Sequence, residues 1–288
     1  MRCKKNQPSA LGSSETIREV SQKFEFNEYN KHGKPDHIKS LDRPFLEWFI
    51  GFSEGDGSFE QSTYSFVINQ KDPKLLFRIK KRLGFGNVYQ TTDQNIWRYS
   101  VTGRKNCLRL YFLFNGNLVL NKTIKRFSTW AHLLNPSFNI IYQPLVITLN
   151  SGWLSGFIEA EGGFYARVRK NKRCKIGYQF MKKFYLSQKD ELELLQTILK
   201  LFQSNAKVYT FEQKTKVYHR IEISSLSSHS LVLQYLEAYP LFGRKNVSLY
   251  NWKRMHGYQE RNEHLCSKGL LKLKHLCRLL RKNNNYFE

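Results

Sequence analysis

The sequence has little cysteine, no long apolar run and few acids, and each shortage excludes a class of protein. Its five cysteines form no CxxC pair and no zinc-like spacing, so we expect scattered free thiols in a reducing compartment. No uninterrupted apolar run is long enough to span a bilayer. Asp and Glu number 23 against 47 Lys and Arg, a net charge of +24 spread over the whole length. This excess favours a polyanionic partner over a membrane-surface helix or mere solubility.

Aromatic residues are plentiful, so the chain can build a real core. It has 288 residues with 21 Phe, 16 Tyr and 5 Trp, which excludes a disordered chain and suffices for one large domain or two compact ones. Residues 1–40 are polar and carry charges of both signs, including four Glu. That composition argues against an acid-poor transit peptide, and we expect no cleavable signal there.

A short acid-bearing segment occurs twice. Residues 49–59 read FIGFSEGDGSF, and residues 154–164 read LSGFIEAEGGF. Both follow one template, in which Gly-Phe is followed by a Glu and then by a second acid next to a glycine. The second acid is Asp56 in one copy and Glu161 in the other. A chain that makes the same element twice is expected to bring the copies together, which would place two carboxylates in one site.

The repeat extends well beyond this motif. Each copy is followed by a strand that ends in Gln-Lys-Asp, an amphipathic helix, a short strand and a return strand. Gln70 corresponds to Gln188, and a closing lysine, Lys122, corresponds to Lys245. The Asp of each Gln-Lys-Asp is expected to cap the next helix. Repeats of about one hundred residues are too long for solenoid units and indicate two pseudo-symmetric halves.

These units predict an α+β fold with antiparallel sheets, because hairpins rather than βαβ crossovers join the strands. Residues 1–40 are expected to form an N-terminal extension and residues 41–135 the first half. Residues 136–150 are the expected linker, and residues 151–288 the second half, which ends in a basic helix.

Local signals place each motif on a helix that ends at the acid. Asp42 followed by Pro44 predicts the start of the first helix, and Gly57 is a natural cap at its end. Small residues four apart share a helix face and allow two backbones to approach closely, although each internal glycine costs up to about 1 kcal/mol. The predicted interface between the two helices consists of Gly51, Gly55, Gly156 and Ala160.

Parallel packing of these helices would bring Asp56 and Glu161 side by side at their carboxyl ends. The helix dipole and mutual repulsion disfavour two negative charges there. Divalent cations between the acids would offset that cost, and such oxygen ligands suit Mg²⁺. Solvated helix ends are the alternative, which two matched acids in so basic a chain make less favourable. Glu54 and Glu159 point elsewhere and are expected to cap or bridge neighbouring backbone.

Matched glutamines and lysines near the acids suggest helpers for phosphate chemistry. Taken singly, each would be an ordinary surface residue. As matched pairs, the lysines can stabilise charge that develops on phosphate, and the glutamines can orient a water. The candidate catalytic residues are therefore Asp56, Glu161, Gln70, Gln188, Lys122 and Lys245.

After Gly162 the chain alternates between apolar and cationic side chains. The pattern predicts a half-buried hairpin with a cationic open face, and a β-ribbon of this kind can enter the major groove of DNA. A solvated sheet face is the alternative, but the charge of the chain favours DNA. The candidate DNA-binding residues are Tyr165, Arg167, Arg169, Lys170, Lys172, Arg173 and Lys175.

FIGFSEGDG and LSGFIEAEG resemble the two signature helices of the LAGLIDADG homing endonucleases in their single-chain, two-motif form. The resemblance covers roughly residues 44–280. It implies two αββαββα halves packed along the motif helices, with an antiparallel β saddle over DNA. It also implies an endodeoxyribonuclease that cuts both strands of a long, nearly non-palindromic target across the minor groove and leaves 3′ overhangs. Such a protein would act as a monomer on double-stranded DNA, without a membrane.

The same resemblance implies a metal site. Asp56 and Glu161, with Gly55 and Ala160 before them, would bind two or three Mg²⁺ ions shared between the halves, and Ca²⁺ is expected to replace Mg²⁺ without supporting cleavage. The glutamine and lysine pairs match the family's active-site glutamine and basic residue. Two features depart from the pattern. One acid is Glu, and acid and glutamine lie 14 positions apart in the first half but 27 in the second. The first hairpin should therefore be short and make fewer DNA contacts.

Two other functions compete with the endonuclease. Some family members are maturases that bind intron RNA and assist the splicing of group I introns, with or without cleavage. A transcription regulator on the same fold would be expected to lack the acids, which are present here. Because family members are usually encoded in organellar introns, the resemblance implies a mitochondrial setting, with the chloroplast as the alternative.

Overall fold

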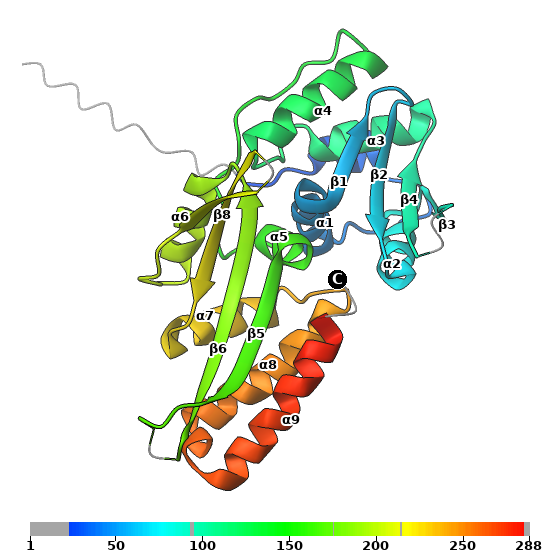
Figure 1. Ribbon diagram of the computed structural model, residues 1–288. Helices are drawn as coiled ribbons and strands as arrows, with labels where there is room; N and C mark the ends of the chain where they lie inside the picture. The colour runs from blue at the N-terminus through cyan, green and yellow to red at the C-terminus, as the bar shows by residue number, and fades with distance from the viewer. Residues whose placement is uncertain (1–22, 93–94, 175, 214, 285–288) are drawn as a thin grey trace, which may run out of the picture.

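The structure, a computed structural model, describes residues 23–92, 95–174, 176–213 and 215–284 (Figure 1). Two four-stranded antiparallel sheets have the strand orders β1-β2-β4-β3 and β5-β6-β8-β7, so the same topology occurs twice. Helices α1 (Arg43–Asp56) and α5 (Trp153–Glu161) lie side by side between the sheets. The predicted α+β class with two pseudo-symmetric units is confirmed.

Each unit continues from its motif helix through two hairpins that are separated by a helix. The first unit contains β1 (Gly57–Glu60), β2 (Ser65–Gln70), α2 (Pro73–Leu83), β3 (Asn87–Gln90), β4 (Trp97–Val101), α3 (Arg104–Phe114) and α4 (Asn121–Leu134). The second contains β5 (Gly162–Lys170), β6 (Tyr178–Lys189), α6 (Leu192–Leu201), β7 (Tyr209–Gln213), β8 (Lys216–Ile223), α7 (Leu226–Ala238), α8 (Lys245–Glu260) and α9 (Ser267–Asn284). Residues 136–150 carry no helix or strand, and the domain boundaries stay a prediction.

Local sequence explains where the motif helix α1 begins and ends. The Asp42 side chain accepts a hydrogen bond from Phe45 N at 3.2 Å, as an N-cap should. Gly57 follows the helix in an extended conformation, with φ −84°, rather than a left-handed one. A Cβ at this position would lie 2.5 Å from Ser53 O, so the glycine is needed for space rather than for its conformational freedom.

The two Gln-Lys-Asp segments differ at their helix starts. Asp72 caps α2 and accepts from Lys74 N at 3.1 Å, as predicted. The matching prediction for Asp190 is wrong, because Glu191 is the N-cap of α6. The Asp190 N–H still donates to Val217 O at 3.3 Å, so strand pairing continues one residue further. Asp190 then turns the chain with a φ of 54°.

The two motif hairpins differ in length, as the spacing of acid and glutamine predicted. β1 has 4 residues and β2 has 6, whereas β5 has 9 and β6 has 12. Helix α9 packs against β5 and α8, on the side where the hairpin extends (Figure 1). The predicted basic C-terminal helix is thus confirmed over Ser267–Asn284.

Part of the expected N-terminal extension belongs to the core. Phe24, Phe26 and Tyr29 are at most 5% exposed and join the hydrophobic cluster around α1 and α3. Residues 1–22 lie outside the described part of the chain. Among the residues described, the cysteines are unpaired, and no helix has the length and apolar character that crossing a membrane requires.

Candidate active site

Helices α1 and α5 pack parallel and almost backbone to backbone. A Cβ on Gly51 would lie 1.9 Å from Trp153 O, and a Cβ on Gly156 would lie 1.8 Å from Trp48 O. Further along, a Cβ on Gly55 would lie 2.3 Å from the Ala160 Cβ. All four small residues named as an interface from the sequence therefore lie where the helices meet. Only glycine fits at the first two positions, because the atoms opposite belong to backbone.

This packing brings the two motif acids to the same end of the interface between α1 and α5, which we call the helix seam. Asp56 is the last residue of α1, and Glu161 is the last residue of α5. Each acid accepts a hydrogen bond from the glutamine of its own half. Gln70 Nε2 donates to Asp56 Oδ2 at 2.7 Å, and Gln188 Nε2 donates to Glu161 Oε1 at 3.2 Å. The glutamines thus orient the carboxylates from the ends of β2 and β6.

Burial makes both acids hard to ionise. Burial and the neighbouring Asp56 charge together raise the pKa of Glu161 to about 7, against the lowering effect of Lys245. Burial likewise raises the pKa of Asp56, while Lys245 and the Gln70 hydrogen bond oppose the shift. A cation placed beside these carboxylates would relieve both effects.

Lys245 is half-buried at this seam. Its Nζ donates to Ala160 O at 2.8 Å and to Ile158 O at 3.4 Å, the last carbonyls of α5. Burial lowers its pKa, and the charges of Glu159, Asp56 and Glu161 oppose that effect. Lys122 lies differently, since its Nζ donates to Lys189 O at 2.9 Å and pairs with Glu191. The structure therefore brings five of the six candidate catalytic residues together as expected and turns Lys122 toward the end of β6.

Glu54 and Glu159 hold the segments that lead to the two lysines. Glu54 accepts from the backbone N–H of Val119 at 3.0 Å and of Leu120 at 2.7 Å, and also from Trp153 Nε1 at 2.7 Å. Glu159 accepts from the N–H groups of residues 242 and 243 at 2.8 and 3.0 Å. The prediction that these acids bridge neighbouring backbone is confirmed. They fix the starts of α4 and α8.

The predicted cationic hairpin face has the expected alternation. Phe164 and Ala166 are buried, whereas Arg167 and Arg169 are exposed on the other face of β5. Tyr165 shares that face but is half-buried. Lys170, Lys172 and Arg173 are exposed near the tip, and Lys175 lies outside the described residues.

Sequence reasoning missed the rest of this face. Lys183 lies opposite Tyr165, and Tyr185 lies opposite Glu222 on the neighbouring strand. Arg220 stacks over the Tyr185 ring, with 4.3 Å from its Cζ to the ring centroid. The alternation of polar residues along β6 was the available signal. It extends the cationic and aromatic face across three strands.

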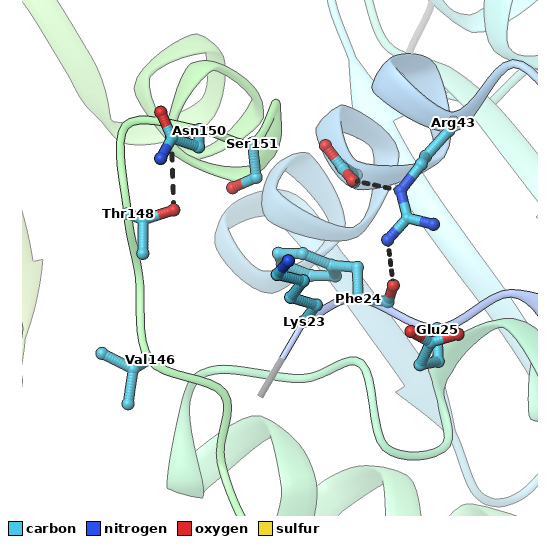
Figure 2. Close-up of a pocket in the computed structure, with 9 residues that line it drawn as sticks. Lys23, Phe24, Glu25, Arg43, Val146, Thr148, Asn150 and Ser151 are labelled. Carbon is cyan, nitrogen blue, oxygen red and sulfur yellow. Dashed lines mark hydrogen bonds and ion pairs between the residues drawn. The ribbon is translucent and has the colours of Figure 1, made fainter. Parts of the chain in front are cut away.

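A cavity of about 610 Å³ lies at the opposite end of the helix seam (Figure 2). Arg43, at the start of α1, pairs with Glu47 and donates to the Phe24 carbonyl there. Thr148 and Ser151 line the other side, before α5. One helix length, about 20 Å, separates this cavity from the acids. It is therefore no part of the acid site.

Known proteins share both the sequence and the fold. The family model described as LAGLIDADG endonuclease matches residues 154–256. A probable intron-encoded endonuclease 4 of Neurospora crassa is 31% identical over 226 residues, which cover 74% of this chain and 40% of that protein. An uncharacterized cox1 intron-2 37.2 kDa protein of Schizosaccharomyces pombe is 25% identical, with 91% of this chain and 80% of that protein covered. The chain thus spans well under half of the Neurospora relative.

The solved structure of the LAGLIDADG meganuclease I-AabMI, bound to uncleaved DNA, superposes with a TM-score of 0.65. It is 22% identical, and the match covers 81% of this chain and 98% of that one. At this identity the likeness shows a shared fold. Residues 154–256 therefore match the LAGLIDADG endonuclease family, and the chain shares the fold of a solved LAGLIDADG meganuclease.

Proposed function

We propose that this protein is a site-specific endonuclease that hydrolyses both strands of a long, nearly non-palindromic DNA target. The observation that carries the proposal is the acid pair, Asp56 and Glu161, held by matching glutamines at the end of a helix seam. The cationic face of β5, β6 and β8 supplies contacts for the duplex. The relative named as a probable endonuclease supports the activity, and the meganuclease solved with DNA supports the ligand.

The acid pair is suited to Mg²⁺. Carboxylate oxygens are the ligands that this ion prefers, and it retains several waters or phosphate oxygens besides them. No group of three or more His, Cys, Asp and Glu side chains suited to a metal occurs among the described residues, so DNA phosphate and water would complete the shell. Asp56 and Glu161 would hold the ions. When bound, the ions would neutralise charge on the phosphate and activate water.

The predicted metal ligands Gly55 and Ala160 have unequal positions. The Ala160 carbonyl accepts from Lys245 Nζ at 2.8 Å, so this ammonium competes with a cation for the oxygen. Lys245 itself lies where it can stabilise charge that develops on a phosphate bound to the acids. We therefore assign the metals to the two carboxylates first, and the electrostatic role to Lys245.

Further features of the proposal come from the family. The protein would act as a monomer, because one chain supplies both acids, and would cut across the minor groove to leave 3′ overhangs. The relative named for a cox1 intron supports a mitochondrial setting. The maturase hypothesis remains separate: assistance to group I intron splicing should survive the loss of Asp56, whereas cleavage should not.

Selection of cleaved sites from a randomised DNA library with Mg²⁺ tests the proposal. Asp56→Asn and Glu161→Gln should abolish cleavage of the selected site while binding in Ca²⁺ persists. Asp190→Asn and Glu193→Gln are matched controls, because they remove the same charges from exposed positions and should leave cleavage unchanged. Cleavage at the wild-type rate by either acid variant, or no cleaved site in the library, would contradict the proposal.

A further inference from the structure

The closing lysines of the two halves both lie in the first turn of a helix. Lys122 is the second residue of α4, and Lys245 is the first residue of α8. In each half a buried glutamate accepts from the backbone N–H groups two and three residues before the lysine, Glu54 for Lys122 and Glu159 for Lys245. The same contact from a buried glutamate thus anchors the segment before each lysine, although the lysine lies one position further into the helix in the first half.

The two side chains nevertheless bind different partners. Lys245 Nζ donates to Ala160 O at 2.8 Å, and its charge lowers the pKa of both site acids. Lys122 Nζ donates to Lys189 O at 2.9 Å and lies 3.4 Å from Glu191 Oε1. Its effect on the pKa of Glu161 is smaller than that of Lys245. Lys245 is therefore the lysine with the stronger electrostatic effect on the acid pair.

One sequence difference between the repeats coincides with the different partners of the two lysines. When Gln70 is aligned with Gln188, Glu191 falls opposite Pro73. The second half therefore offers Lys122 a carboxylate, while the first half has none at the matching position for Lys245. Next to Lys245, an ion pair between Arg244 and Asp72 at 3.2 Å joins the two halves, and Lys245 takes no part in it.

We propose that Glu191 is a positioning residue that holds Lys122 back from the acid pair and makes cleavage of one DNA strand slower than cleavage of the other. This inference rests on the proposed endonuclease function. The Glu191 side chain is 16% exposed and the Lys122 side chain 34%, so solvent screens the pair only in part. Removing the carboxylate frees the ammonium to turn toward the phosphate bound at the acids.

Strand-specific cleavage of a selected target, with each 5′ end carrying a different fluorophore, tests the inference in the full chain with Mg²⁺. The wild-type protein should nick one strand first. Glu191→Gln should accelerate the slower strand by about fivefold, since an ion pair of this exposure is weak, and leave the faster strand unchanged. The gain should vanish in Glu191→Gln combined with Lys122→Met, because it depends on the freed lysine.

Glu193→Gln is the matched control, because it removes the same charge from the same helix start at an exposed position. It should change neither strand rate. Three outcomes would overturn the inference without refuting the endonuclease function. They are equal cleavage rates of the two strands in the wild type, an unchanged ratio of these rates in Glu191→Gln, and an acceleration of the slower strand that persists in the double variant without Lys122. Failure of the wild type to cut any target would instead refute the proposed function. A fall in both strand rates in parallel would mark Glu191 as merely structural.

Discussion

Replacing Glu161 by Gln should stabilise the metal-free protein at alkaline pH. Burial and the Asp56 charge raise the pKa of Glu161 from 4.5 to about 7. An acid whose pKa is higher in the folded state favours folding below its unfolded pKa, and this contribution is lost as the pH rises toward 7. Ionised Glu161 therefore costs the metal-free fold about 3 kcal/mol at pH 8. Gln removes the charge and keeps an oxygen that can accept from Gln188.

Urea unfolding followed by tryptophan fluorescence measures this effect. In EDTA, Glu161→Gln should exceed the wild type by up to about 3 kcal/mol at pH 8 and match it at pH 4. Addition of Ca²⁺ should stabilise the wild type and leave the variant nearly unchanged, because a ligand stabilises only the state that binds it. Glu193→Gln should behave like the wild type throughout. A variant less stable than the wild type at pH 8, or a difference that does not depend on pH, would refute the electrostatic reasoning.

Three further results are expected. Gly51→Ala should lower the free energy of unfolding by about 1–3 kcal/mol, because its Cβ would meet Trp153 O at 1.9 Å. Gly257→Ala in α8 is the control: its Cβ meets only the flexible end of Arg261, and the free energy of unfolding should rise by up to about 1 kcal/mol. Urea titration of both variants checks these values. Lys245→Met should slow cleavage about 100-fold in single-turnover assays with little change in Kd, and a pure loss of affinity would contradict its electrostatic role. Arg167→Ala should weaken DNA binding and reduce the salt slope by about 1 if it contacts phosphate; an unchanged slope would exclude that contact.

Features that depend on repeated short-range patterns could be predicted from the sequence. The caps Asp42 and Asp72 bind their own neighbouring backbone, and the small residues of α1 and α5 have a fixed spacing on a helix face. The alternation along β5 likewise fixes which side chains are buried. The positions of the acids and glutamines follow, because each lies at or next to the end of a helix or strand that these local rules define.

Features that depend on a choice between several tertiary partners could not be predicted in this way. The symmetry of the repeat suggested the same role for Lys122 and Lys245, but the side chain of Lys122 meets Glu191 from the other half. Asp190 resembled an N-cap, yet its N–H pairs with Val217 O and the residue forms the turn between β6 and α6. In each case a contact between residues distant in sequence prevailed over a local preference, and no spacing along the chain encodes that contact.

The charges at the helix seam give an independent reason to expect divalent cations at the acid pair. Three carboxylates, Asp56, Glu159 and Glu161, act on the ammonium of Lys245. With all groups ionised the cluster carries a net charge of minus two, because Glu191 already engages the other lysine. Buried charge of this size is unfavourable unless it is compensated. Protonation of one acid removes one unit of this negative charge, as the raised pKa of Glu161 indicates. One Mg²⁺ compensates both units and leaves the carboxylates of Asp56 and Glu161 ionised.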